Sequence, residues 1–302
     1  MTTIPMSFGG QEFADVELGD VRRTRRLVRV ADACLAGPGR SLPDTCHDPA
    51  AYQATLRLFR HPAVTHRAVL APHQARTLDR AERHPDTVLI VHDTTELDFS
   101  GHRTLAGHLG PIGNGGGRGL LCHNSLAVDS ATGHLLGLVA QQLHVRVAVG
   151  KAEPRAAKRD RATRESRLWA NALDEIGPAP ADRRWVHVAD RGADAFEFLS
   201  RLCRGRERFV VRVQHDRALP GSGSLLAVVR ATPAVAAWEL AVSATPTRKA
   251  RETRVCASHT RVTVPPPHNR RGDYPAVPIE VSVVRVWEPA PRPGRYRWSG
   301  CC

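Results

Sequence analysis

The periodicity of the hydrophobic residues changes near residue 85. Up to that point apolar residues recur with a helical period, which is typical of amphipathic helices packed on one face. Asp48 followed by Pro49 marks one helix start, and Pro72 either kinks a later helix or divides it. Helices are expected over 21–36, 49–60 and 66–84. The pattern therefore predicts a small all-α, arginine-rich domain over residues 1–85.

Beyond residue 85 the rhythm changes to short runs of β-branched and aromatic residues between turn residues, which indicates strands. Strands are expected at 87–91, 120–129, 134–147, 185–189 and 208–213. Helices are expected among the later strands, at 156–176 and 193–204. This order, with consecutive strands first and helices entering later, is that of a ribonuclease-H-like mixed sheet. The expected fold class is therefore α/β.

The last third of the chain predicts a β-strand insertion into that sheet domain. Short strand-like runs are expected at 225–229, 238–242, 255–264 and 277–288. The last two alternate like paired strands on either side of a proline-rich loop, and a further strand is expected to begin at 296–298. We therefore expect an α/β domain over residues 86–302, with an inserted β-subdomain at about 215–298.

Composition adds a strong basic excess. The 302 residues carry 43 Lys plus Arg against 30 Asp plus Glu, a formal net charge of +13, and nearly all the bases are arginines. GC-rich coding can select arginine over lysine, whereas a polyanionic partner would select the excess itself, and both explanations stay open. No apolar run approaches a membrane span and the start lacks a signal-peptide pattern, so a cytoplasmic protein is expected.

Two aspartates each follow an expected strand. Asp93 comes after 87–91 and Asp190 after 185–189. The first and fourth strands are neighbours in the ribonuclease-H-like order, so both carboxylates are expected at one edge of the sheet. Oxygen ligands are those that Mg²⁺ prefers, which predicts a magnesium site there. Taken alone, Asp93 in Asp-Thr-Thr would also suit an Asx turn, and the scattered histidines are expected to be structural.

Five sequence blocks carry a resemblance to a known family. In chain order they are LGDVRRTRRLVRVA, TLRLFRHPAV, VHDTTELDF, VADRGADAFEFL and ERFVVRVQH. Together they resemble the bacterial cut-and-paste DDE transposases, and among these the insertion-sequence-four group with its transposon-five-like members, over about residues 12–298. The resemblance implies a helical DNA-binding domain, a ribonuclease-H-like catalytic domain, and two Mg²⁺ or Mn²⁺ ions held by Asp, Asp and Glu. It implies strand nicking, hairpin formation and strand transfer on double-stranded transposon ends, carried out by a synaptic dimer.

The resemblance also assigns individual residues. Asp93 and Asp190 match the first two metal-binding carboxylates, and Gly192 stands where close relatives often have glutamate. Arginines that match DNA contacts are Arg22, Arg23, Arg26, Arg57 and Arg212. Arg40 lies where a basic residue commonly follows the glycine, and the loop of Arg118 is expected to line the same groove as Arg212. Trp298 matches a tryptophan on which a flipped base stacks. Structural roles stay open as alternatives to these DNA contacts: the arginine run as a solvated helix face, Arg212 as a surface strand residue, and Trp298 as a core residue.

The end of the sequence departs from the family pattern. From that tryptophan onward the sequence reads WSGCC, and the block Y-x-x-R-x-x-x-E that carries the third carboxylate in the family does not occur. We therefore expect a C-terminally truncated copy that lacks the third metal ligand and the family's dimerisation region, and that is catalytically incomplete. The alternative expectation is a non-catalytic DNA-binding remnant or an inhibitor of transposition.

Overall fold

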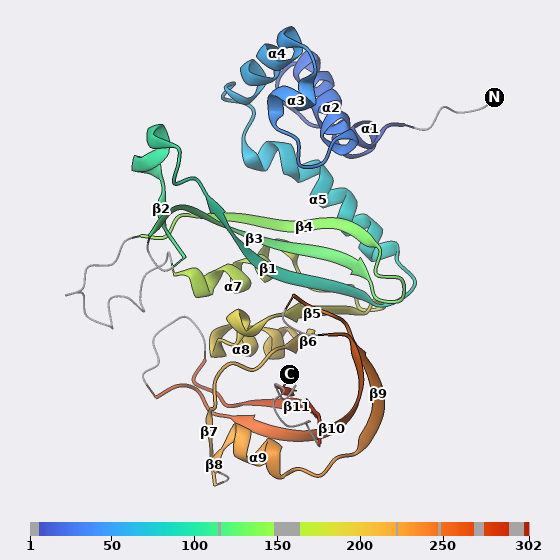
Figure 1. The fold of residues 1–302 in the computed structure, drawn as a ribbon, viewed down its shortest axis with the longest axis vertical. Coiled ribbons are helices and arrows are strands. Elements are labelled where there is room, and N and C mark those ends of the chain that lie inside the picture. Colours follow the sequence, from blue (N-terminus) through green and yellow to red (C-terminus); the bar gives the residue numbers. More distant parts are fainter. Residues whose placement is uncertain are drawn as a thin grey trace. The chain divides into compact units, whose positions relative to one another are not determined.

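The computed structural model describes residues 6–113, 116–147, 164–221, 223–246, 249–268, 275–289 and 299–301. The chain forms two compact units (Figure 1). Unit 1 combines Met1–Asp86 with Leu126–Ala140, and unit 2 combines Thr87–Ser125 with Gln141–Cys302. The helical region expected from the sequence thus shares its unit with a segment from the middle of the chain.

Helices make up the N-terminal part of unit 1. They are α1 (Phe8–Phe13), α2 (Val21–Ala36), α3 (Leu42–Cys46), α4 (Pro49–Phe59) and α5 (His66–Arg83). The predicted helices are confirmed as α2, α4 and α5, and α5 remains one helix across Pro72. Asp20, Asp48 and Thr65 cap them by accepting backbone N–H groups of the first turn. The sequence pattern misses α1 and α3, because so few residues cannot display a helical period.

α1 crosses α2 at a glycine that leaves no room for a side chain. The Gly9 N–H donates to Asp32 Oδ1 at 2.6 Å, and a Cβ at Gly9 would lie 2.3 Å from the Val28 carbonyl oxygen. The buried core of the helical region consists of Val16, Leu18, Leu27 and Leu58. Removal of these apolar side chains from water holds the helices together.

The tip of the hairpin formed by β3 (Gly117–Asp129) and β4 (Leu135–His144) completes unit 1. Gly137 of β4 has φ +146°, and a Cβ there would lie 2.2 Å from Thr77 Oγ1 of α5. The next residue, Leu138, donates its N–H to His73 Nε2 at 3.1 Å, and His73 Nδ1 lies 2.7 Å from Glu12 Oε2. Since Nε2 accepts, Nδ1 carries the proton and donates to the carboxylate. Hydrogen bonds therefore connect β4, α5 and α1 in series.

The main sheet has the strand order β2-β3-β1-β5-β6, with β4 paired to β3. Its remaining strands are β1 (Val88–Asp98), β2 (Gly110–Ile112), β5 (Trp185–Ala189) and β6 (Arg208–Val211). β1 pairs with β5, and β5 with β6, in parallel. The first predicted strand therefore lies beside the fourth, and the expected fold class, a ribonuclease-H-like mixed sheet preceded by a helical region, is confirmed.

Two helices of unit 2 cover one face of this sheet. α7 (Leu168–Ile176) contributes Trp169, whose ring meets that of His123 on β3, and α8 (Phe196–Gly205) contributes Phe198, whose ring meets that of His92 on β1. The predicted helix at 156–176 is thus confirmed at its C-terminal end, while its start lies outside the described residues. Short 3₁₀ turns are η1 (Arg103–His108), η2 (Glu165–Arg167) and η3 (Arg191–Ala193).

A second sheet, of order β12-β11-β10-β9, follows in unit 2. Its strands are β9 (Ala236–Val242), β10 (Arg251–Val264), β11 (Ile279–Trp287) and β12 (Ser299–Cys301), and its neighbours pair in antiparallel fashion. β10 and β11 confirm the predicted paired strands of the insertion. The small strands β7 (Ala218–Leu219) and β8 (Gly223–Ser224) pair separately. The strand start expected at 296–298 lies outside the described residues.

One predicted strand of the insertion is wrong. Residues 225–229 belong to helix α9 (Leu225–Ala231). Ser224 Oγ caps this helix by accepting the Ala227 N–H, and Leu225 and Val229, one turn apart, are both buried in the same core as β10 and β11. Burial of a helical i, i+4 pair therefore overrides the strand preference of the valines.

Candidate functional site

Three charged residues fall in one row across the parallel strands β1, β5 and β6. Ala189 is the last paired residue of β5 toward both neighbours, and the next position holds Asp190. Continued in register, Asp190 lies opposite Asp93 of β1 and opposite Arg212, which directly follows β6. The Arg212 N–H donates to the Ala189 carbonyl at 3.1 Å, so hydrogen bonding between β5 and the chain after Val211 extends to Arg212. Neighbouring strands are about 4.8 Å apart, which brings the three exposed side chains together.

The turn after β5 fixes Asp190. Its carboxylate accepts the Gly192 N–H at 2.8 Å and caps η3. A Cβ at Gly192 would lie 3.0 Å from Asp190 Oδ1 and 3.1 Å from the Trp169 ring. The glycine that replaces the glutamate common in the family pattern is therefore the residue that this tight packing accommodates.

Asp93 does not end its strand, contrary to the sequence prediction. β1 continues to Asp98 because its other edge still pairs with β3. Beyond Asp93, Thr94 Oγ1 lies 2.8 Å from His123 Nδ1, and the Phe99 N–H donates to the Arg118 carbonyl at 2.9 Å. Asp93 thus stands where the pairing with β5 stops, and this position still brings it to Asp190.

Three buried histidines form a row inside the same sheet: His123 on β3, His92 on β1 and His187 on β5. His92 Nε2 lies 2.9 Å from His187 Nδ1, and His92 Nδ1 lies 2.8 Å from Ser125 Oγ. The ring of His92 stacks on His187 with centroids 5.2 Å apart and on His123 with centroids 6.0 Å apart.

Burial keeps this histidine row uncharged. It lowers the pKa of His123 and of His187 to about 4. Burial, together with the neighbouring His187 and His123, lowers the pKa of His92 well below 6.5. For His123 the charge of the Asp93 carboxylate works in the opposite direction and raises the pKa, but burial outweighs it. The three imidazoles are therefore neutral at pH 7 and serve as polar core residues.

The chemistry of Asp93 and Asp190 fits part of a divalent-cation site. Asp93 and Asp190 offer carboxylate oxygens, the ligands that Mg²⁺ and Mn²⁺ prefer. Within the described part of the chain, no group of three or more His, Cys, Asp and Glu side chains is placed to hold a metal ion. The paired aspartates are thus a two-ligand arrangement among these residues.

The arginines predicted to contact DNA from the helical region differ in their surroundings. Arg22 is exposed at the start of α2, and Arg26 is half-buried one turn later. Arg23 instead donates from Nη1 to the Leu18 carbonyl at 2.6 Å, so it also holds the chain before the helix. Arg57 is exposed on α4.

The other predicted DNA contacts lie apart from α2 in the sequence. Arg40 is exposed in the loop before α3, and Arg118 is exposed on β3. Arg212 is the one that the sheet brings to the aspartates. Trp298 lies outside the described residues. The contact between the three histidines of the row could not be predicted from the sequence. The sequence indicates only that each histidine occupies an inward-facing position of a strand.

Comparison with known proteins gives one match in the helical region. Residues 5–64 match the family model described as transposase DNA-binding. This segment covers α1 to α4, so the N-terminal region of the chain is similar to transposase DNA-binding domains. None of the helices in the described ranges is long and apolar enough to cross a membrane.

A solved structure shows a weaker, chain-wide similarity. The cryo-EM structure of the piggyBac transposase synaptic complex with hairpin DNA matches at a TM-score of 0.35 and 12% sequence identity. The match covers 86% of this chain and 51% of that one, so this chain spans about half the length of that protein.

Proposed function

We propose that the chain is a DDE-class transposase that binds transposon-end DNA through its helical region and contributes Asp93 and Asp190 to metal-dependent phosphodiester cleavage and strand transfer. The observation that carries the proposal is the row of Asp93, Asp190 and Arg212 across three parallel strands. The finer placement in the insertion-sequence-four group rests on the five sequence blocks and belongs to the same proposal.

Binding of the DNA backbone is supported by the surface of α2. Arg22, Arg25 and Arg29 are exposed on this helix, which lies inside the segment that matches transposase DNA-binding domains. The planar guanidinium fork binds phosphate oxygens in pairs. Such contacts position the protein on the duplex and weaken as salt rises, but they do not read sequence.

At the sheet edge we assign metal binding to the acidic residues and phosphate binding to the basic residue. Asp93 and Asp190 would hold Mg²⁺ or Mn²⁺, which when bound activates the attacking oxygen and stabilises the leaving oxygen of a phosphodiester. Arg212, one strand further, would donate to a non-bridging phosphate oxygen and offset the charge that develops there. The Gly192 N–H, which donates to Asp190 Oδ1 at 2.8 Å, restricts the conformations of this carboxylate.

A second function is a DNA-binding protein without catalysis, which would compete with intact transposases for DNA ends. Two observations favour it: the described residues contain no three-ligand metal group, and the family match is confined to residues 5–64. Binding and cleavage therefore need separate experiments.

The binding test measures the dissociation constant for duplex DNA by fluorescence anisotropy across a series of salt concentrations. We expect the double variant Arg22→Ala/Arg25→Ala, which removes two exposed arginines of α2, to lower the slope of log Kd against log salt by about 2, since each lost phosphate contact removes about 0.9. The matched control is Arg204→Ala/Arg230→Ala, which removes two exposed arginines of unit 2. Equal slopes in both variants would disprove binding through α2.

The cleavage test uses the same chain with a labelled transposon-end duplex and Mg²⁺ or Mn²⁺. Nicking that disappears in Asp93→Asn and in Asp190→Asn would support the transposase. DNA binding without nicking, unchanged by these two substitutions, would support the non-catalytic alternative.

A further inference from the structure

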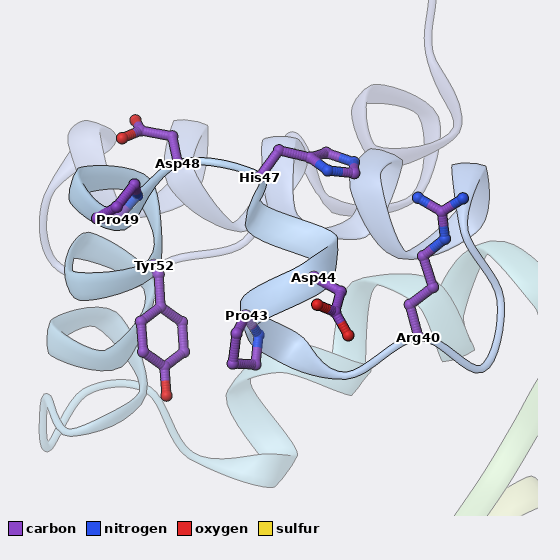
Figure 2. Close-up of a pocket in the computed structure, with 7 residues that line it drawn as sticks. All are labelled: Arg40, Pro43, Asp44, His47, Asp48, Pro49 and Tyr52. Atoms are coloured by element: carbon purple, nitrogen blue, oxygen red, sulfur yellow. The ribbon is translucent and has the colours of Figure 1, made fainter.

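The helical region of unit 1 contains a pocket of about 670 Å³ between α3, α4 and the loop before α3 (Figure 2). Its lining combines the ring of Tyr52 and Pro43 with the guanidinium of Arg40, the carboxylate of Asp44 and the imidazole of His47. This volume lies within the range of about 300–1,000 Å³ typical of small-molecule sites. An apolar surface with a few polar groups is also typical of such sites.

The link between α3 and α4 shapes the pocket. His47 ends α3 with φ +53°, a left-handed conformation that is uncommon outside glycine. Asp48 then uses both carboxylate oxygens to accept the N–H groups of Ala50 and Ala51 at the start of α4. Asp48 is thus engaged in capping, so Asp44 is the carboxylate available to a ligand.

Several polar groups of the pocket have no partner. In the part of the chain that the structure describes, the side chains of Arg40, His47 and Tyr52 form no hydrogen bond or ion pair. Asp44 interacts through Oδ2 with the hydroxyl of Ser41. Figure 2 shows Asp44 and Pro43 coming from α3, Tyr52 from α4 and Arg40 from the preceding loop.

The charges of the lining favour an uncharged occupant over a phosphate. Two carboxylates, of Asp44 and Asp48, stand against one guanidinium, so an anion entering the pocket would be repelled. A neutral ligand that offers both donors and acceptors, and a flat face for Tyr52, satisfies all the groups. A nucleobase has these properties.

We propose that the pocket receives an unpaired guanine of the bound DNA. Guanine offers O6 and N7 as acceptors for Arg40, and its amino group as a donor to Asp44. Its face can stack on Tyr52, as unpaired bases stack on aromatic side chains in other nucleic-acid-binding proteins. A paired base is recessed below the phosphates of its groove, whereas a concave pocket needs a projecting ligand. The inference rests on the proposed DNA binding.

The test compares duplexes of identical flanks that carry one extra unpaired nucleotide: guanine, adenine, cytosine, thymine or an abasic site. Fluorescence anisotropy with the full chain should show the extra-guanine duplex binding about tenfold tighter than the abasic one. This preference should vanish in Tyr52→Ala and in Asp44→Asn and persist in Tyr52→Phe, which keeps the ring. Circular dichroism of each variant verifies its helical content.

The outcomes separate this inference from the proposed function. Failure to bind any duplex would contradict the proposed function. Tight binding with equal affinity for the guanine and abasic duplexes would contradict only the assignment of the pocket to guanine. A preference that survives Asp44→Asn and Tyr52→Ala would also overturn it. Calorimetry with guanosine distinguishes the source of the base, since saturable binding of guanosine without any preference for the extra-guanine duplex would assign the pocket to a free nucleoside.

Discussion

Mild acid should destabilise unit 2 through its buried histidine row. Burial holds the pKa of His123 and His187 at about 4, against an ordinary value of 6.5. As the pH falls through 6.5, the unfolded chain binds protons that the folded chain does not, so the equilibrium shifts toward unfolding. The stability is complete above pH 6.5 and declines until the pH passes the folded pKa near 4, below which the loss levels off.

The size of the effect follows from these pKa shifts. Between pH 7.5 and 5.5 each histidine should cost about 1.3 kcal/mol of unfolding free energy. His123 and His187 together should therefore remove about 2.6 kcal/mol, and the lowered pKa of His92 acts in the same direction. This is a large share of the roughly 5–15 kcal/mol that stabilises a typical domain. Carboxylates with lowered pKa, such as Asp98 and Asp129, start from an ordinary value of 3.8 and act only at lower pH.

Urea unfolding at pH 7.5 and 5.5, followed by tryptophan fluorescence, measures this loss. Trp169 and Trp185 are buried in unit 2, so their emission reports its unfolding. The variant His187→Gln should lose less stability across this pH interval than the wild type, while the control His259→Gln, at an exposed position of β10, should keep the wild-type dependence. A pH-independent unfolding free energy, or equal dependences in His187→Gln and wild type, would refute the reasoning.

Three further substitutions test other parts of the structure. Gly137→Ala should lower the thermal midpoint by several degrees, equivalent to about 2 kcal/mol, because its methyl group would collide with Thr77; an unchanged midpoint would contradict the close approach. Asp48→Ala should cost about 1 kcal/mol in urea unfolding by uncapping α4, and Asp48→Asn should restore most of it. Arg212→Ala should slow any metal-dependent nicking by about 100-fold while leaving duplex affinity in anisotropy within twofold, and a parallel loss of binding would place this arginine elsewhere on the DNA.

The sequence predicts the helical region well because its signals are local. Asp48 and Thr65 are caps that act within one turn, and the apolar period of 21–36 extends over several turns. The segment 225–229 has one such signal in Ser224, but its five apolar residues fit a buried strand as well as a helix. The difference is made by Val229 reaching the core beside β10 and β11, a contact with residues distant in the sequence.

The candidate site divides in the same way. The proximity of Asp93 and Asp190 could be predicted from the sequence because strand order alone makes their strands neighbours. The histidine row could not be predicted, because the contact between the rings of His92 and His187 depends on register and on burial under α8, which strand order alone does not give. The pocket depends on one left-handed residue, His47, and no sequence rule predicts that conformation for histidine.

The contacts of the arginines show which part of the basic excess is available to bind a polyanion. Many arginines serve the fold: Arg80 pairs with Glu12, Arg146 with Glu96 and Glu165, and Arg164 with Glu197. Each of these ion pairs lies within one unit, and its arginine is not available to a polyanion. The arginines of α2 are different, because in the described part of the chain none of them forms an ion pair: Arg22, Arg23, Arg25, Arg26 and Arg29. The net charge of +13 therefore points to a nucleic acid only through its unpaired part, and α2 concentrates unpaired arginines within the segment that matches transposase DNA-binding domains.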